Sequence, residues 1–325
     1  MGGSLVTGVT EAEGKGPRIA VLLPCYNEDA AIAQTIAGFR ASLPSATIYV
    51  YDNNSRDRTR EVAAAAGAIV RAERMQGKGH VVRRMFADIE ADVYVMADGD
   101  ATYDAAAAPE LVRRLVDEQL DMVVGARKSE VEEAYRRGHR LGNKVLTGML
   151  AWLFGRTFSD ILSGYRVFSR RFVKSFPALA RGFETETEIS VHALELAMPV
   201  AEVVTAYGAR PEGSVSKLST YGDGWRILKT ILHLFRIERP VLFFGGIALL
   251  LAAIAVAISI PLAITYLETG LVPRFPTAIL ATGLILLAAL SFACGLILDT
   301  VVRGRREVRR LAYLALPAPG MQDRS

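Results

Sequence analysis

Two aspartates one residue apart, Asp98 and Asp100, follow a run of apolar residues in the stretch YVMADGDATYD. Two carboxylates this close repel each other, so a cation is expected between them. Magnesium and manganese prefer hard oxygen ligands and usually share them with substrate phosphates. Gly99 allows a close approach of the backbone at this point. The stretch predicts a site for a divalent ion and a diphosphate, although such a triplet alone is a weak signal.

Further polar clusters follow other apolar runs. PCYNE (24–28) ends the first run, YDNNSRDRT (51–59) the second and GARK (125–128) the fifth. A solvated loop would also be polar, so each cluster alone has an ordinary explanation. Lys78, between two glycines in QGKGH, can meet a phosphate or a carboxylate, or it can simply lie in the first turn of a helix. The spacing around Lys78 is not that of a Walker motif.

The elements that would position these clusters alternate between two patterns. Short apolar runs predict strands, and periodic segments predict helices. The strands are expected at 18–24, 46–52, 68–72, 92–98 and 121–127, and the helices at 27–44, 56–67, 77–91 and 107–119. This alternation indicates an α/β domain with right-handed crossovers and a mostly parallel sheet. Ligands bind outside the carboxyl ends of such strands, so the clusters are expected to share one binding cleft.

Two uncharged segments, 241–267 and 275–298, carry much of the 51% hydrophobic content of this 325-residue chain. Each is long enough to cross a bilayer, and buried core helices are the alternative. Arg236 and Arg239 precede the first segment, and five arginines lie between 303 and 310. The positive-inside rule then predicts a transmembrane hairpin in the inner (cytoplasmic) membrane, with both termini and the domain in the cytoplasm.

Two basic amphipathic segments lie before this hairpin. The segment 136–160 contains Arg136, Arg137, Arg140 and Lys144, and it is either a core-facing helix or a helix at the membrane surface. The segment 221–240 leads directly into the first span, and its tryptophan and basic residues suit the membrane interface.

The charge, the cysteine content and the first residues of the chain indicate which partners and segments to expect. The formal net charge of +4 is explained by the arginines that flank the spans and meet anionic lipids, so no nucleic-acid partner is expected. Cys25 and Cys294 support neither a disulfide nor a metal site. Residues 1–17 lack the apolar core of a signal peptide and are expected to form a flexible tail.

The motifs VLLPCYNEDAAI, VYDNNSRDRT, QGKGHVVRRM, VMADGDATYD and LSGYRVFSRRF occur in this order, followed by GFETETEI, GSVSKLSTYGDG and the two spans. In this order they resemble the polyprenyl-phosphate glycosyltransferases of glycosyltransferase family 2, a group that includes dolichol-phosphate-mannose synthases and bacterial undecaprenyl-phosphate sugar synthases. The resemblance covers about residues 18–240. It implies a GT-A (Rossmann-like) domain at 18–220, an amphipathic helix at 221–240, a transmembrane hairpin within 241–302 and a basic cytoplasmic tail at 303–325.

The resemblance implies transfer of a sugar from a UDP- or GDP-linked donor to a polyprenyl phosphate, with Mg²⁺ or Mn²⁺ as cofactor. The implied catalytic residues are Asp98, Asp100 and Arg127, of which the two aspartates bind the metal. The implied nucleotide-sugar site comprises Pro24, Tyr26, Asn27, Glu28, Asp52, Asn54, Asp57, Lys78, Asp98 and Gly99. The implied acceptor-phosphate residues are Arg127, Arg140, Arg210, Ser216 and Lys217. Mannose synthases often carry a glutamine shortly after the metal-binding triplet, which is DGD (98–100) in this chain. This chain has ATY (101–103) at that place, so the resemblance does not determine which sugar is transferred.

Other questions also stay open. Glu184 and Glu186 either begin a helix capped by Thr185 or Thr187, or contact sugar hydroxyls. A processive polysaccharide synthase is one alternative function. Such an enzyme would show more membrane spans and a Q-x-x-R-W segment, to which GDGWRILKT has only slight similarity. An inactive membrane-tethered scaffold is the other alternative, and the paired aspartates argue against it. The lipid bilayer is an expected partner, and a homo-oligomer is compatible with the sequence.

Overall fold

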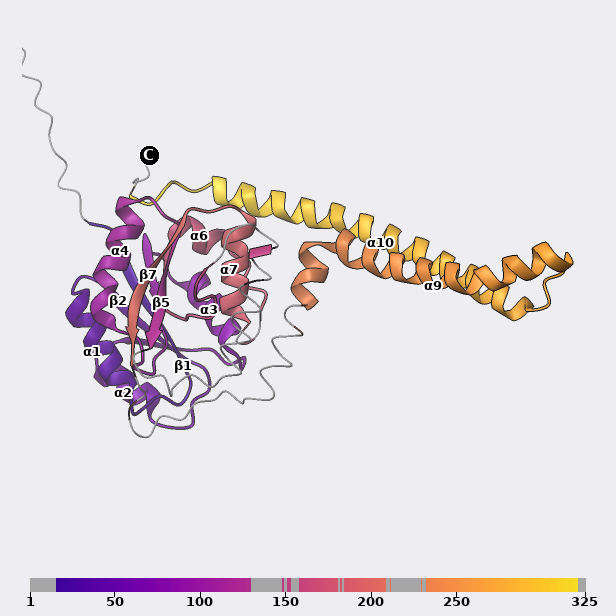
Figure 1. Ribbon diagram of the computed structural model, residues 1–325. Coiled ribbons are helices and arrows are strands. Elements are labelled where there is room, and N and C mark those ends of the chain that lie inside the picture. Colours follow the sequence, from indigo (N-terminus) through magenta and orange to yellow (C-terminus); the bar gives the residue numbers. More distant parts are fainter. Residues whose placement is uncertain are drawn as a thin grey trace, which may run out of the picture.

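The computed structural model describes residues 16–129, 148, 151–152, 158–180, 182, 184–208, 211, 229 and 232–320. A seven-stranded sheet has the order β3-β2-β1-β4-β6-β5-β7. The strands are β1 Ile19–Cys25, β2 Thr47–Asp52, β3 Ile69–Ala72, β4 Val93–Met96, β5 Met122–Ser129, β6 Arg166–Ser169 and β7 Val200–Tyr207. The helices that surround it are α1 Ile32–Ser42, α2 Thr59–Ala65, α3 Lys78–Asp88, η1 Ala105–Ala107, α4 Ala108–Asp117, α6 Arg170–Ser175 and α7 Thr185–Glu195 (Figure 1).

The predicted mostly parallel sheet is confirmed, with one exception at its centre. β1 is parallel to β2 and β4, β2 is parallel to β3, and β5 is parallel to β7. β6 is antiparallel to both of its neighbours, β4 and β5. β6 therefore separates β5, the fifth predicted strand, from β4, which leads to Asp98. The carboxyl ends of β4 and β5 still point to the same edge.

Both faces of the sheet are covered, which explains why β1 is apolar throughout. Ala20 and Leu22 pack into a core with α3, α6 and α7, whereas Val21 and Leu23 pack into a second core with α1, α2 and α4. Successive side chains of a strand point to opposite faces, so one uninterrupted apolar run serves both cores.

The first helix starts later than predicted. Asn27 has a φ of 54°, outside the helical region, and the carbonyl of Glu28 accepts the first bonds, from Ala31 and Ile32. Residues 26–31 are therefore a loop at the carboxyl end of β1. This loop contains Tyr26, Asn27 and Glu28, which were predicted to bind the nucleotide sugar.

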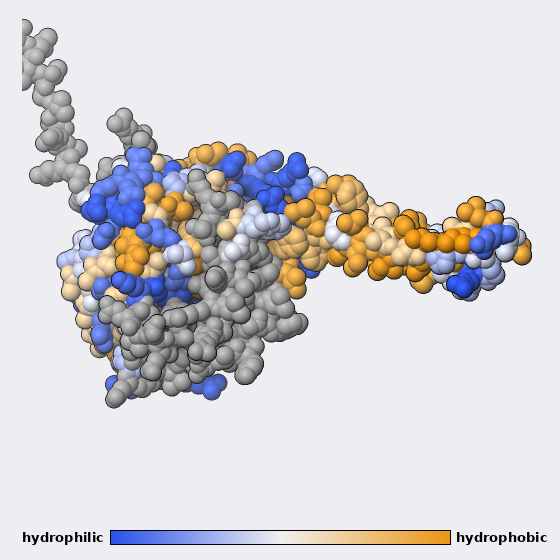
Figure 2. All heavy atoms as spheres, viewed as in Figure 1, coloured by the Kyte–Doolittle hydropathy of each residue, from blue (hydrophilic) through white to orange (hydrophobic). Residues whose placement is uncertain are grey.

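Two long apolar helices, α9 (Pro240–Thr269) and α10 (Phe275–Leu314), project from the domain as a hairpin (Figure 1). Each is long and apolar enough to cross a membrane, and only 6% and 17% of their most apolar windows are buried. This exposure excludes the alternative of buried core helices. Figure 2 shows the hairpin surface as predominantly hydrophobic. The two helices suggest membrane anchoring.

Small residues bring the two hairpin helices into close contact. A Cβ on Gly295 would lie 3.2 Å from Cβ of Phe244 and 3.3 Å from the carbonyl oxygen of Pro240. The Ser291 hydroxyl donates to the carbonyl of Phe244 at 3.0 Å. Larger side chains at these positions of α10 would force the helices apart.

The C-terminal part of α10, which falls within the predicted basic segment 303–325, docks on the domain. Arg306 pairs with Glu195 at 3.0 Å and with Glu238 at 2.9 Å, and Arg309 also pairs with Glu195. Tyr313 donates to Asp121 at 2.8 Å. These two arginines, which were expected to meet lipid headgroups, are thus neutralised by carboxylates of the protein. We call the contacts of α10 residues 306–313 with the domain the α10 joint.

Of the two predicted amphipathic segments, the structure describes only parts. Residues 232–238 are helical, and Leu234 and Phe235 pack against the core on the α3 face. Most of 136–160 lies outside the described residues.

Candidate active site

Asp98 follows β4 and meets a cation of the protein itself. Its Oδ1 accepts a hydrogen bond from Nζ of Lys78 at 2.5 Å. A Cβ on Gly164 of the SGYR motif would lie 2.8 Å from Oδ2 of Asp98, so a larger residue there would displace this carboxylate. The carboxylate side chain is about one-third exposed, at 32%, and can reach a ligand in solution.

Gly99 allows a close approach of the backbone, and the neighbour in this structure is the protein itself. A Cβ on Gly99 would lie 2.4 Å from Sγ of Cys25 and 3.3 Å from Cδ1 of Ile32. The hydroxyl of Thr35 also donates to the carbonyl of Gly99, at 3.3 Å. The close neighbour of this backbone is therefore β1 and α1 of the protein. The glycine lets the turn with the two aspartates pack against the end of β1.

Asp100 is buried and held in one orientation. Its Oδ1 accepts from the hydroxyl of Thr102 at 2.6 Å and from the Thr102 amide at 3.2 Å. Ala101 between them has a φ of 57°, which tightens the turn. A carboxylate fixed in this way is preorganised for its ligand.

The donor set fits a divalent ion that shares its ligands with a substrate. Asp98 and Asp100 supply hard carboxylate oxygens from the same turn after β4. Among the described residues no group of three or more His, Cys, Asp or Glu side chains could enclose a metal. Mg²⁺ is commonly bound by one or two carboxylates together with phosphate oxygens, which is the arrangement available here.

Lys78 is the first residue of α3 and lies between two carboxylates. Its Nζ is 2.5 Å from Oδ1 of Asp98 and 2.5 Å from Oε1 of Glu186, and its side chain is 10% exposed. Burial by itself would lower the pKa of Lys78, but the two carboxylates outweigh burial and raise this pKa, so the side chain is an ammonium ion. Gly79 makes this position possible, because a Cβ there would lie 2.1 Å from the carbonyl oxygen of Ala180.

The two glutamates at the start of α7 have different surroundings. Glu186 is buried and contacts Lys78, so it belongs to the site. Glu184 is the exposed N-cap residue of α7 and makes no side-chain capping bond. The predicted helix start is correct, but the predicted threonine cap is wrong, because the hydroxyl of Thr185 donates to the carbonyl of Gly182. Contacts of either glutamate with a sugar stay a prediction.

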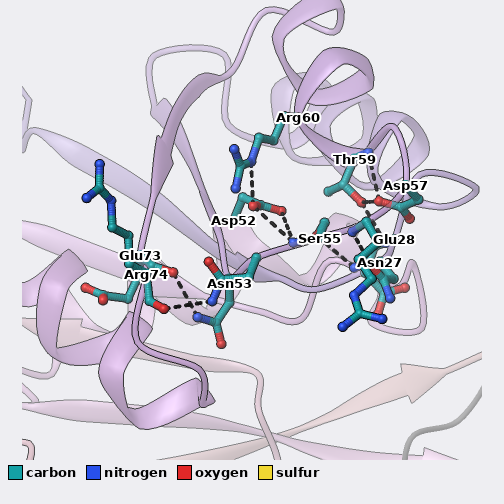
Figure 3. Close-up of polar contacts among 12 residues, drawn as sticks. Asn27, Glu28, Asp52, Asn53, Ser55, Asp57, Thr59, Arg60, Glu73 and Arg74 are labelled. Carbon is teal, nitrogen blue, oxygen red and sulfur yellow. Dashed lines mark hydrogen bonds and ion pairs between the residues drawn. The ribbon is translucent and has the colours of Figure 1, made fainter.

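The loops after β1 and β2 are tied together in one polar network (Figure 3). The amide of Asn27 donates to the Ser55 hydroxyl at 2.9 Å, and that of Glu28 donates to the Thr59 hydroxyl at 2.9 Å. Asp57 accepts from the amide and the hydroxyl of Thr59. Although burial acts to raise the pKa of Asp57, these bonds lower it overall. Four predicted nucleotide-site residues, Asn27, Glu28, Asp57 and the neighbouring Asp52, thus lie on these adjoining loops.

Asp52 is fully buried at the end of β2 and is already paired. It accepts from Nε of Arg60 at 2.6 Å and from the amide of Ser55 (Figure 3). The contact of Asp52 with the nucleotide sugar, which stays a prediction, would therefore be made beside Arg60. Pro24, near the end of β1, and Tyr26, in the loop that follows, are half-buried.

Asn53 is a site-building residue that sequence reasoning missed. Its Nδ2 donates to the carbonyls of Glu73 and Met75, and its Oδ1 accepts from the amide of Gly77 at 2.7 Å. Asn54, with a φ of 64°, donates to the carbonyl of Arg74. The asparagine pair therefore fixes the loop that precedes Lys78. The only sequence signal was the NN pair itself, which is common in turns.

Arg127 on β5 binds a carboxylate with its fork. Its Nε and Nη2 donate to Asp160 at 2.6 and 2.8 Å, and its guanidinium lies 5.5 Å from the ring centre of Tyr207. Burial raises the pKa of Asp160, but the guanidinium more than offsets this and the pKa is lowered. The role of Arg127 at an acceptor phosphate stays a prediction. The other predicted acceptor residues, Arg140, Arg210, Ser216 and Lys217, lie outside the described residues.

A buried arginine shapes the SGYR loop beside Asp98. Arg166 is fully buried, and it donates to the carbonyls of Ser163 at 2.9 Å and Ile161 at 2.5 Å. Burial lowers the pKa of Arg166 to about 10. The amide of Gly164 donates to the hydroxyl of Tyr103 at 2.8 Å. These bonds hold Gly164 against Asp98.

Comparisons with known proteins agree with this geometry. The model of glycosyl transferase family 2 matches residues 20–176. Glycosyltransferase AglJ of Haloferax volcanii is 34% identical over 250 residues, which are 76% of this chain and 81% of that protein. A dolichyl-phosphate hexose transferase of the same organism is 27% identical over 221 residues, 68% of this chain and 95% of that protein.

A solved structure shows the same fold. Glucosyl-3-phosphoglycerate synthase from Mycobacterium tuberculosis, in complex with Mn²⁺, UDP-glucose and phosphoglyceric acid, superposes with a TM-score of 0.54 at 26% identity, over 67% of this chain and 79% of that one. The domain is therefore GT-A-like, and the reaction is glycosyl transfer from a nucleotide sugar. The chain belongs to glycosyltransferase family 2.

Proposed function

We propose that this glycosyltransferase transfers one sugar from a nucleoside-diphosphate sugar to a polyprenyl phosphate at the cytoplasmic face of the membrane. The observation that carries the proposal is the joining of two features in one chain. A nucleotide-sugar edge with paired aspartates is continuous with a hairpin of two exposed apolar helices. An acceptor that is itself embedded in the bilayer explains why the enzyme would carry such an anchor.

The donor is held at the edge formed by β1, β2 and β4. Asp98 and Asp100 would hold Mg²⁺ or Mn²⁺, which when bound supplies Lewis-acid stabilisation of the departing diphosphate. UDP is the first donor nucleotide to test, because the M. tuberculosis synthase binds UDP-glucose with Mn²⁺. Lys78 places a second positive charge at the same point.

The acceptor needs little activation by the protein. A phosphate monoester is largely ionised at neutral pH, since its second pKa is about 6. Its oxygen attacks the anomeric carbon, the bond from that carbon to the diphosphate oxygen breaks, and the nucleoside diphosphate leaves with the electron pair. In-line attack inverts the anomeric centre. The protein must screen two anions and align them, and alignment can contribute up to roughly 7–11 kcal/mol to lowering the barrier.

The similarity to a dolichyl-phosphate hexose transferase supports a polyprenyl acceptor. The positive-inside rule supports a hairpin with both ends cytoplasmic, because Arg239 and Arg303 lie just outside the apolar stretches. In the proposed topology the domain faces the cytoplasm.

The purified full chain in detergent should be incubated with Mn²⁺, a panel of radiolabelled UDP- and GDP-sugars, and undecaprenyl phosphate. We expect label in the organic phase with one donor, dependent on the lipid phosphate and lost in Asp100→Ala. Label in a growing polymer would favour a processive synthase instead. Binding of donor with no transfer to any acceptor would favour an inactive scaffold.

A further inference from the structure

Lys78 forms a closed ion triplet with Asp98 and Glu186. The ammonium contacts both carboxylates at 2.5 Å, and the Lys78 and Glu186 side chains are 10% and 7% exposed. Asp98, at 32%, is the member that faces outward. The three residues come from the start of α3, the end of β4 and the start of α7. One buried cation therefore already sits on the carboxylate assigned to the metal.

Two cations cannot share one carboxylate without opposing each other, because like charges at such distances repel strongly where water is excluded. An ion that binds Asp98 must displace the ammonium or tolerate its charge. The lysine stem is flexible enough to move, with four rotatable carbons and a point charge at its end. Glu186 offers the ammonium a second anchor that does not face outward.

The start of α7 is fixed, so Glu186 is a firm anchor. Thr185 donates to the carbonyl of Gly182 at 2.7 Å. The carboxylate of Glu188 accepts from the amides of Leu179 and Ala180 at 2.9 and 2.8 Å. The Ala180 carbonyl in turn abuts Gly79 next to Lys78. The anchor and the lysine are therefore parts of one packed unit.

We propose that Lys78 is a resident counter-cation of the site: it holds Asp98 before the divalent ion arrives, and Glu186 then retains it beside the diphosphate of the donor. The proposal rests on the proposed function for the place of the metal. It makes Glu186 a positioning residue that acts through Lys78. The proposal also predicts that substitutions of Lys78 and of Glu186 change the affinity for the divalent ion in opposite directions.

Mn²⁺ affinity can be measured without the acceptor, by electron paramagnetic resonance of free Mn²⁺ titrated into the full chain with UDP present. Lys78→Met removes the competing charge and should lower the Mn²⁺ dissociation constant about fivefold or more. Glu186→Gln leaves the ammonium with Asp98 alone and should raise this constant about threefold or more. Turnover with UDP-sugar and polyprenyl phosphate should fall in both variants.

Matched controls lie at the other end of α3. Lys174 pairs with Glu90 at 2.6 Å, outside the site, so Lys174→Met and Glu90→Gln repeat both substitutions on a more exposed ion pair of the same domain. Both controls should leave the Mn²⁺ constant unchanged. Should Lys78→Met not fold, the sign of the change in Glu186→Gln decides the matter.

The outcomes separate the two proposals. Wild-type protein that binds no Mn²⁺ with UDP would overturn the proposed metal and this inference together. A different set of results would overturn this inference alone. The wild-type protein would bind Mn²⁺, but Lys78→Met would bind it no more tightly than the wild type, or Glu186→Gln would bind it no more weakly.

Discussion

Glu195 is the centre of the α10 joint, and neutralising it should loosen the hairpin from the domain. Its carboxylate side chain is 2% exposed and accepts from both Arg306 and Arg309, whose side chains are 35% and 19% exposed. Breaking a fully buried ion pair costs roughly 3–5 kcal/mol. The two arginines keep some contact with water, and Arg306 keeps Glu238. We therefore expect Glu195→Gln to cost about 2–3 kcal/mol, below that range.

The assay is the thermal unfolding midpoint of the detergent-solubilised full chain, followed by tryptophan fluorescence. A loss of this size should lower the midpoint by about 4–10 °C for a domain of this length. Arg303→Ala is the matched control on the same helix, because Arg303 pairs with Asp299 one turn away and is 76% exposed. Such surface pairs contribute at most about 0.5 kcal/mol.

A double-variant cycle tests the pairing itself. Glu195→Gln combined with Arg309→Gln should be less destabilising than the sum of the two single changes, by about 1 kcal/mol or more. UDP binding should stay near wild type, because Asp121 and Glu195 lie at the amino ends of the strands, away from Asp98. The reasoning is refuted if Glu195→Gln shifts the midpoint no more than Arg303→Ala does.

Four further outcomes are expected. Asp100→Ala should abolish sugar transfer and manganese-dependent UDP binding, because Asp98 alone does not hold the ion. Near-normal turnover with intact manganese dependence would exclude Asp100 as a metal ligand. Arg127→Ala should raise the KM for polyprenyl phosphate roughly 10–100-fold and change the KM for the donor much less. Arg127→Lys should restore the acceptor KM only in part. Equal effects on both KM values would show that Arg127 is not part of the acceptor site. Burial, and to a smaller extent Arg309, lowers the pKa of His192 to about 3. The neutral imidazole therefore contributes its full stability above about pH 6.5, and this contribution declines as the pH falls, by at most about 1.4 kcal/mol per pH unit. His192→Asn should make the free energy of unfolding, measured with denaturant, less dependent on pH between about pH 4 and 6.5. A cysteine at position 274 should be labelled from outside the cell and one near the C-terminus should not; the reverse pattern would contradict the hairpin topology.

Local pattern was enough to predict the framework of the domain. The apolar runs that became β1 and β4 are uninterrupted because both faces of the sheet are covered there. The polar clusters after β1, β2 and β4 then had to share one edge, since parallel strands end on the same side. β6 escaped prediction because it is a four-residue strand with Arg166 buried inside it.

Long-range pairs could not be read from pattern. Arg306 and Glu195 are 111 residues apart, and positive charge after a span is equally typical of lipid contact. Lys78 and Glu186 are separated by more than a hundred residues, and a glutamate near a helix start has an ordinary explanation. Charge identifies which residues need partners, and only the fold determines which partner each one has.

Mass spectrometry of the lipid product tests the central claim most directly. The purified protein, Mn²⁺, the preferred nucleotide sugar and undecaprenyl phosphate should yield one new lipid, with the mass of undecaprenyl phosphate plus a single dehydrated sugar residue. Polyprenol without its phosphate should yield no product. Addition of several sugars to one lipid, addition to the unphosphorylated alcohol, or transfer only to a soluble acceptor such as phosphoglyceric acid would contradict the proposed reaction.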